Sequence, residues 1–393
     1  MSSLDSNTIK RLRLPLALCI ILIHLHMQVS GTQIEWGALT SLDVWRIFAC
    51  VSINELAAIA VPLFFMISGF LFFNSQRSGA ESSGDVPSPL PLGEVGDRLS
   101  IFSKLRRRVR TLLVPYVLFC LLAVIGLVVN HSMQGHILAD SLHTYLGNGK
   151  WLHNFWDVHT TGTNTNILGI SKPISYPVCI PLWFIRDLMV IILMTPLIRW
   201  ALLRLRLWWI AIMIVFSVTG IWIPLVGFSA TSCLWFSIGG WFSLRGESMA
   251  DSFVSVRTPL LCAAISLLFL DILTDGTPTD RYVHFAFLLV AVPAVYTLFS
   301  TFQSFNPSIL QSFNVQSLSF FIFAFHTLPI PFLGCRPVEW AKQLLWTDSA
   351  NGWLCILQFV GAALLTALIC LLTYSVLQTL CPKFLYLLTG RKK

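Results

Sequence analysis

The chain has 393 residues, of which 55% are apolar and 11% are Asp, Glu, Lys or Arg. A soluble domain carries about 25% charged residues, so this composition cannot cover a water-exposed surface. It excludes a soluble globular enzyme, a disordered chain, a collagen and a nucleic-acid-binding module, and it predicts a membrane protein. The net charge of +8 is therefore interpreted through membrane topology, with no nucleic acid expected as a partner.

Long unbroken apolar runs recur along the chain, unlike the short alternating segments of a membrane β-barrel. Each run can cross about 30 Å of hydrocarbon as a helix that rises 1.5 Å per residue. The sequence thus predicts an all-α polytopic membrane helix bundle of about ten transmembrane helices, in a single domain over residues 1–393. The expected spans are 13–30, 54–74, 111–130, 179–198, 207–224, 229–244, 258–274, 282–300, 315–333 and 353–377.

The Lys and Arg residues between the spans predict the orientation of the bundle. If the N-terminus is cytoplasmic, the inner segments hold 19 of the 26 cations and the outer segments hold 6, with Arg186 inside a span. Cytoplasmic loops of membrane proteins carry an excess of Lys and Arg. We therefore expect both the N- and the C-terminus in the cytoplasm.

Two of the expected connections are long. Residues 75–100 are rich in Ser, Gly and Pro, which predicts a flexible cytoplasmic linker without a fold of its own. Residues 131–178 form the longest extracytoplasmic loop and hold five histidines with several aromatic residues, so part of this loop should pack over the outer mouth of the bundle. The histidine spacing matches no compact ligand pattern, and no metal site is expected.

The first span holds the sharpest candidate for catalysis. Arg13 stands at its expected cytoplasmic start, and His24 lies eleven residues, or about 16 Å, deeper along the helix. A neutral imidazole can accept a proton near pH 7, and the planar guanidinium of an arginine suits phosphate groups. The plainer interpretation makes Arg13 a topology anchor and His24 a buried structural histidine.

The fourth span contains the segment PLWFIRDL, with Arg186 and Asp187 inside it. Ionisable residues within a span are costly and by default indicate function. Adjacent residues on a helix do not face each other, so each is expected to find a partner on another helix or in a polar cavity. Arg186 could stabilise an anionic donor or a developing oxyanion, or it could form a structural ion pair.

Other polar residues mark weaker candidates. His326 lies in an apolar aromatic segment of the ninth span, and Glu55 opens the second span. Ser68 and Gly69 permit close packing of helices. The stretch KLRRRVR at 104–110, which includes Arg107 and Arg108, could bind nucleotide phosphates, although anionic lipid head groups explain it equally well.

The ordered set of these segments resembles the acyltransferase-3 family of integral-membrane bacterial acyltransferases, in its stand-alone form. The resemblance covers about residues 11–330. It rests on Arg13 with His24 as the R-x10-H signature, PLFFMISGFLFF, KLRRRVRTLLVPY, PLWFIRDL and FIFAFHTL.

The resemblance implies an O-acyltransferase that moves an acyl group from acyl-CoA to a hydroxyl of a cell-envelope or exported glycan. The acyl group that it implies first is acetyl. It implies a multi-pass protein of the bacterial plasma membrane, with no permanently bound cofactor. Its partners would be acyl-CoA, a glycan or lipid-linked saccharide, and membrane lipid. The implied site has catalytic His24, Arg13 and Arg186, donor-binding Arg13, Arg107 and Arg108, and substrate-binding His326, Glu55 and Trp183.

A transporter or flippase for a glycan or lipid intermediate is the alternative from another functional class. It would also place Arg and His inside about ten spans, and the long outer loop suits it. The chain shows no internal repeat, which weakens this alternative. A membrane sensor or structural subunit without catalysis is the third possibility, and the presence of both Arg13 and His24 argues against it.

Overall fold

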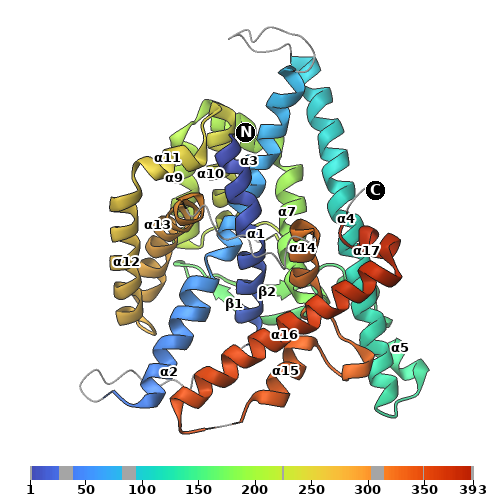
Figure 1. Ribbon diagram of the computed structural model, residues 1–393. Helices are drawn as coiled ribbons and strands as arrows, with labels where there is room; N and C mark the ends of the chain where they lie inside the picture. The colour runs from blue at the N-terminus through green and yellow to red at the C-terminus, as the bar shows by residue number, and fades with distance from the viewer. Residues whose placement is uncertain are drawn as a thin grey trace.

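The computed structural model describes residues 2–25, 39–81, 94–223, 225–301, 314–347 and 349–390, with the side chains of all but 75–81, 94–107, 109, 110 and 161. Within these ranges the chain forms a bundle of helices with a two-stranded hairpin (Figure 1). The expected helical architecture is confirmed, and the hairpin is the departure from all-α. The elements are α1 (Ser3–His24), α2 (Ser41–Ala49), the π-helix η1 (Cys50–Ala57), α3 (Ala60–Glu81), α4 (Glu94–Met133), α5 (Leu138–Leu146), α6 (Lys150–His153), β1 (His159–Thr165), β2 (Ser171–Tyr176), the 3-10 turn η2 (Ile180–Leu182), α7 (Trp183–Leu193), α8 (Thr195–Arg204), α9 (Leu207–Thr219), α10 (Ala230–Arg245), α11 (Met249–Ser255), α12 (Arg257–Thr274), α13 (Asp280–Thr301), α14 (Val315–Phe325), the 3-10 turn η4 (Pro331–Leu333), α15 (Pro337–Leu345), α16 (Gly352–Leu380) and α17 (Pro382–Leu388).

Five helical segments are long and apolar enough to cross a membrane, or six if α7 and α8 form one bent span; only the described residues were considered. The five segments are Ser41–Asn74, Thr111–Met133, Arg257–Thr274, Asp280–Thr301 and Gly352–Leu380. They coincide with five of the expected spans. The prediction of a helical membrane protein is thus supported, while the count of ten spans and the orientation of the termini stay predictions.

Of the other expected spans, the first falls on the 22-residue α1 and the remaining four fall on helices that are broken or shorter than 18 residues. The span at 179–198 divides into α7 and α8, which are bent by 62°, and Pro196 stands in the first turn of α8 where it cannot donate a backbone hydrogen bond. Helix α9 ends at Thr219, before a left-handed Gly220, and α14 ends at Phe325. Residues 26–30 of the first expected span lie outside the described residues.

Helix α1 passes through the bundle, and its buried apolar residues fix its position there. Leu12, Leu16, Ala17 and Ile20 are almost fully buried. Near the start of the helix, the buried carboxylate of Asp5 accepts hydrogen bonds from the Tyr296 hydroxyl at 3.0 Å and from the Ala250 backbone N–H at 2.9 Å. These bonds join α1 to α13 and α11, so the side chains that α1 carries are held in place.

Helices α3 and α10 pack with their backbones in close contact. A Cβ atom added to Gly69 would lie 2.0 Å from the carbonyl oxygen of Phe236, and one added to Gly239 would lie 1.8 Å from that of Met66. Such separations are far below van der Waals contact, so a side chain at either position is excluded. The expected packing role of Gly69 is confirmed.

Both long connections contain regular secondary structure. Helix α3 continues to Glu81 and α4 begins at Glu94, so the expected linker at 75–100 has helical ends, and residues 82–93 lie outside the described residues. The chain is helical there because 75–81 and 94–100 extend apolar helices that have already formed. The outer loop, 131–178, contains α5, α6 and the β1–β2 hairpin. Asn154 is buried in it, and the Tyr116 hydroxyl of α4 donates a hydrogen bond to the Phe155 carbonyl.

Candidate active site

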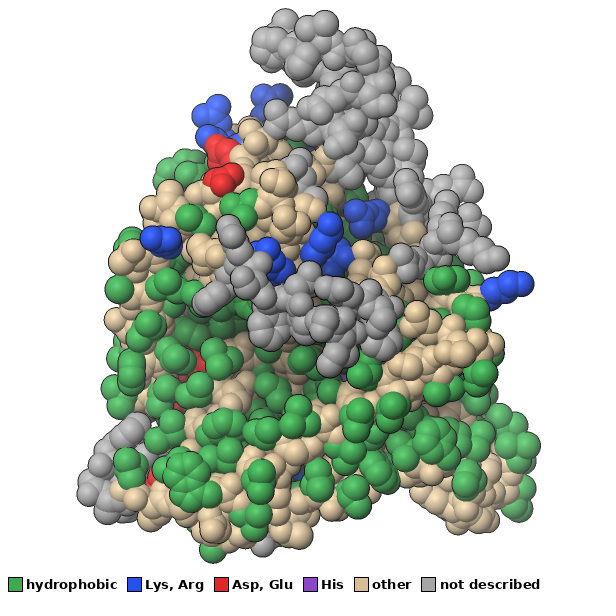
Figure 2. Space-filling view, in the orientation of Figure 1, with side chains coloured by type: hydrophobic (Ala, Val, Ile, Leu, Met, Phe, Trp, Pro, Cys, Tyr) green, Lys and Arg blue, Asp and Glu red, His purple; other side chains and the backbone are tan. Residues whose placement is uncertain are grey.

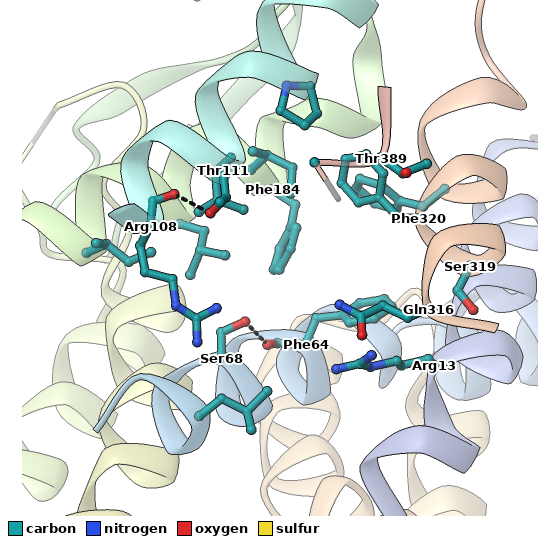
Figure 3. A pocket seen from close by; sticks show the side chains of 18 of the residues that line it. Arg13, Phe64, Ser68, Arg108, Thr111, Phe184, Gln316, Ser319, Phe320 and Thr389 are labelled. Carbon is teal, nitrogen blue, oxygen red and sulfur yellow. Dashed lines mark hydrogen bonds between the residues drawn. The ribbon is translucent and has the colours of Figure 1, made fainter. Parts of the chain in front are cut away.

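Arg13 and Arg108 line one cavity of about 280 Å³ between α1, α3, α4, α7 and α14. Figure 3 shows the two guanidinium groups pointing into the same space from different helices. They lie close enough for their charges to repel each other. None of the described residues that line this cavity is Asp or Glu. The charge that the described lining residues bring to this cavity is therefore positive, which favours an anionic ligand over a cationic one.

The rest of the cavity wall combines hydroxyl and amide groups with aromatic rings. The polar groups come from Ser68, Thr111, Gln316, Ser319 and Thr389 (Figure 3). The Ser68 hydroxyl donates to the Phe64 carbonyl of its own helix at 2.7 Å. The other described lining residues are mostly apolar or aromatic, so the cavity suits a ligand with an anionic head and a less polar arm.

His24 and His326 meet at the ends of α1 and α14. Their ring centroids are 5.0 Å apart and the rings stand edge to face, with 79° between their planes. In each residue Nδ1 lies 2.9 Å from the carbonyl oxygen four residues earlier, Ile20 for His24 and Ile322 for His326. A carbonyl can only accept, so Nδ1 carries the hydrogen and Nε2 is the basic nitrogen of each ring. Both imidazoles are therefore held in the same tautomer by the same local hydrogen bond.

The cavity that Arg13 and Arg108 share and the histidine pair are neighbours along α14. Phe323 lines the cavity, and His326 follows it after one helical turn. Phe323 also packs against Phe64 and Phe184, with ring centroids 6.3 and 5.9 Å away, so three rings close this end of the cavity. The described residues that line the cavity thus include Arg13 but neither His24 nor His326, which lie one turn beyond Phe323.

Arg186 is not among the described residues that line the first cavity. Its guanidinium pairs with Asp187 at 2.9 Å and donates to the carbonyl oxygens of Trp156 at 2.5 Å and Ser175 at 3.2 Å. Each of the two residues is expected from the sequence to find a partner elsewhere in the bundle; Arg186 does so at the two carbonyl oxygens, but it also pairs with Asp187, which the expectation missed. The arginine side chain is long enough to turn back along α7, although the two Cβ atoms diverge. Its remaining donors fasten the outer loop to the bundle.

A second cavity, of about 240 Å³, lies where α7 meets the hairpin and the segment before α10. Arg186, Asp187, Trp183, Lys172 and Tyr176 line it. Helix α7 separates it from the first cavity, since Phe184, Ile185 and Leu188 face the Arg13 side. The structure therefore brings Trp183 together with Arg186, and it places neither beside Arg13.

Glu55 contributes to neither cavity. It is buried in η1, where its carboxylate lies 3.3 Å from Nδ1 of His284. Asp271 lies on the other side of the same nitrogen, at 3.0 Å. Asp271 and His284 are not among the residues predicted from the sequence, although each is an ionisable residue inside an expected span, the signal that pointed to Arg186.

The basic stretch contributes Arg108 to the first cavity, while the side chain of Arg107 lies outside the described part of the structure. Gln316, Ser319 and Thr389 carry no signal of their own in the sequence. They become part of the site because α14 and the end of α17 meet α1 and α4 there (Figure 1).

Comparison with known proteins matches the chain to one family model. The model, described as an acyltransferase domain of the acyltransferase-3 type, covers residues 7–375, which include Arg13, His24, Arg186 and His326. No similar chain was found among curated proteins or solved structures. Since the match spans nearly the whole chain, the protein belongs to the acyltransferase-3 family and is an acyltransferase with membrane-spanning helices.

Proposed function

We propose that this protein is an O-acyltransferase of the bacterial plasma membrane that moves an acyl group, and acetyl in particular, from acyl-CoA to a hydroxyl of a cell-envelope or exported glycan. The observation that carries the proposal is the cavity that Arg13 and Arg108 share, in which the described lining residues include two guanidinium groups and no Asp or Glu. Coenzyme A is an anionic nucleotide with a long, uncharged pantetheine arm. Its phosphates are complementary in charge to the two guanidinium groups, and its arm is complementary to the apolar and aromatic residues that line the rest of the cavity.

The position of His24 supports its role as the general base. It lies about 16 Å along α1 from Arg13, beyond the rings of Phe64, Phe184 and Phe323. In this role the arm of a donor held at its phosphates passes these rings to reach the histidine pair. Nε2 of His24 takes the proton of the acceptor hydroxyl while the oxygen attacks the thioester carbonyl carbon. The carbon–sulfur bond then breaks, and the coenzyme A thiolate leaves and takes up the proton.

The cations of the molecule favour entry of the donor from the cytoplasm. Lys and Arg side chains gather at the end of the bundle where the N-terminus lies, and the face in view below them is mostly apolar (Figures 1 and 2). This distribution agrees with the positive-inside rule. Arg13 and Arg108 belong to the segments that this rule assigns to the cytoplasmic side of the membrane.

The second cavity suits a saccharide acceptor. Trp183 and Tyr176 offer aromatic faces, and Lys172, Arg186, Asp187 and Ser229 offer polar groups of both kinds. Sites of this composition orient a polar ligand through a few placed groups. In this account Arg186 holds the outer loop over the acceptor, and its charge is already used by Asp187 and two carbonyl oxygens.

The proposal is tested with purified protein in detergent or vesicles, given acetyl-CoA and a library of envelope saccharides. Wild type should release coenzyme A and form an O-acetyl ester, detected by mass spectrometry. His24→Ala should lose roughly 10²- to 10⁴-fold in rate. His143→Ala, an exposed histidine of the outer loop, is the matched control and should keep full rate. A flippase would release no coenzyme A, and an unchanged His24→Ala rate would remove His24 from the mechanism.

A further inference from the structure

Glu55, Asp271 and His284 form a buried cluster that neither proposed substrate cavity uses. One carboxylate or imidazole atom from each lies within 4.8 Å of the others. The residues come from η1, α12 and α13, and 229 positions separate Glu55 from His284 along the chain. We propose that this cluster binds one divalent transition-metal cation, such as Zn²⁺ or Mn²⁺, which joins η1 to the α12–α13 hairpin.

The hydrogen bonds within the cluster do not satisfy its members. Nδ1 of His284 faces both Asp271 Oδ2, at 3.0 Å, and Glu55 Oε2, at 3.3 Å. A ring nitrogen carries a single hydrogen, so it can serve one of these two acceptors well and the other poorly. The second oxygen of Asp271, Oδ1, is buried and has no hydrogen-bond partner among the described residues. A buried polar atom without a partner is costly, and a cation beside this carboxylate removes the cost.

The charges of the cluster also call for a cation. Glu55 is 3% exposed and Asp271 is 1% exposed, so both carboxylates are shielded from water. A protonated histidine carries one positive charge and leaves the trio negative. Among the described residues, Glu55 and Asp271 share one ion-pair partner, His284. Asp275 and Asp280, in and after the α12–α13 turn, interact electrostatically with the same region and make it more negative.

The spacing of the ligand atoms fits metal coordination. Two ligands about 2.1 Å from one ion, at tetrahedral or octahedral angles, lie roughly 3.0–3.4 Å apart. The distances from His284 Nδ1 to Asp271 Oδ2, 3.0 Å, and to Glu55 Oε2, 3.3 Å, fall in that interval. Glutamate, aspartate and imidazole together are ligands of Zn²⁺ and Mn²⁺, and His284 is partly exposed, which leaves a way in for the ion and for water ligands.

The test measures metal binding to the full-length protein in detergent and is independent of acyl transfer. After treatment with a chelator and its removal, wild type is titrated with Zn²⁺ by calorimetry and with Mn²⁺ by electron paramagnetic resonance. Wild type should bind about one ion per chain. The near-isosteric variants Glu55→Gln and Asp271→Asn should bind at least about tenfold more weakly. The control His136→Ala disrupts the stacked pair of His131 and His136 in the outer loop and should bind like wild type.

Thermal unfolding provides a second measurement that does not depend on the variants folding equally well. Added Zn²⁺ or Mn²⁺ should raise the Tm of wild type and of His136→Ala, and should leave the Tm of Asp271→Asn unchanged. The proposal is overturned if wild type shows no saturable binding. It is also overturned if Asp271→Asn binds as tightly as wild type, or if His136→Ala alone loses the ion.

Discussion

The imidazole of His24 stands edge to face against the imidazole of His326, with ring centroids 5.0 Å apart. His326 is fully buried, and its Nε2 has no hydrogen-bond partner among the described residues. Both rings are oriented by the same bond from Nδ1 to a helix carbonyl. The pair is therefore a fixed arrangement of two basic nitrogens, one partly accessible and one enclosed.

This arrangement predicts that His326 acts through Nε2 and not through the bulk of its ring. His326→Phe keeps an aromatic ring against His24 and removes both nitrogens. We expect kcat to fall by about two orders of magnitude, with little change in KM for acyl-CoA and little change in Tm. Steady-state kinetics and thermal unfolding measure these quantities. Full kcat in His326→Phe would mean that the ring only packs.

Two glycines of transmembrane helices should respond differently to an added methyl group. In Gly69→Ala the new Cβ meets the Phe236 carbonyl at 2.0 Å, so the α3–α10 contact must open, at a cost of about 1–3 kcal/mol. In Gly361→Ala the nearest atom, a methyl of Leu345, is 3.4 Å away, and the substitution should be neutral or stabilising. Thermal unfolding of both variants in one detergent makes the comparison, and equal Tm values would contradict it.

The pair of Arg186 and Asp187 predicts a stability effect that can be separated from catalysis. Arg186→Met leaves Asp187 as a buried carboxylate without its partner, which costs about 3–5 kcal/mol in comparable pairs. It also removes two hydrogen bonds to the outer loop. We expect a lower Tm and faster proteolysis within residues 131–178, and partial recovery when Asp187→Asn is added. A single variant with normal Tm and normal proteolysis would contradict this role.

His159, at the start of the outer hairpin, predicts a dependence of stability on pH. Burial, and then the charge of Arg336, lower the pKa of this histidine below its ordinary value of 6.5. Below about pH 6.5 the unfolded chain therefore binds a proton that the folded chain does not, so the free energy of unfolding falls as the pH decreases. His159→Phe should lose part of this slope between about pH 7 and pH 5, measured as Tm against pH. An identical slope in His159→Phe and wild type would exclude the effect.

The sequence predicted features that depend on one segment at a time. Apolar length identified the membrane helices, and the R-x10-H spacing placed Arg13 and His24 on one helix because helical rise is constant. For the basic stretch it left both nucleotide phosphates and anionic lipid head groups open as ligands, and in the structure Arg108 lines the same cavity as Arg13.

What could not be predicted depends on residues that are far apart in the chain. Asp271 joins Glu55 because α12 and η1 pack together, and no spacing encodes that contact. The bond between Arg186 and Asp187 depends on a side-chain conformation, which helical periodicity does not describe. The breaks in the shorter spans follow from local backbone features, such as Pro196 at the start of α8, acting within the packed bundle.

The division of labour between Arg13 and His24 is tested most directly by kinetics with two donors. Acyl-CoA carries the nucleotide phosphates, and acyl-pantetheine lacks them. Arg13→Ala should raise KM for acyl-CoA by roughly 10- to 100-fold and leave KM for acyl-pantetheine unchanged, because charge-assisted hydrogen bonds to phosphate are lost. His24→Ala should lower kcat for both donors. Arg257→Ala, an exposed arginine at the start of α12, is the matched control and should behave as wild type.

The most direct measurement compares, in Arg13→Ala, the change in KM for acyl-CoA with the change in KM for acyl-pantetheine. A selective loss for acyl-CoA, with kcat for acyl-pantetheine preserved, is the result that the account predicts. Equal KM values for acyl-CoA in wild type and Arg13→Ala, or equal losses for both donors, would contradict it and would place the donor outside the cavity that Arg13 and Arg108 share.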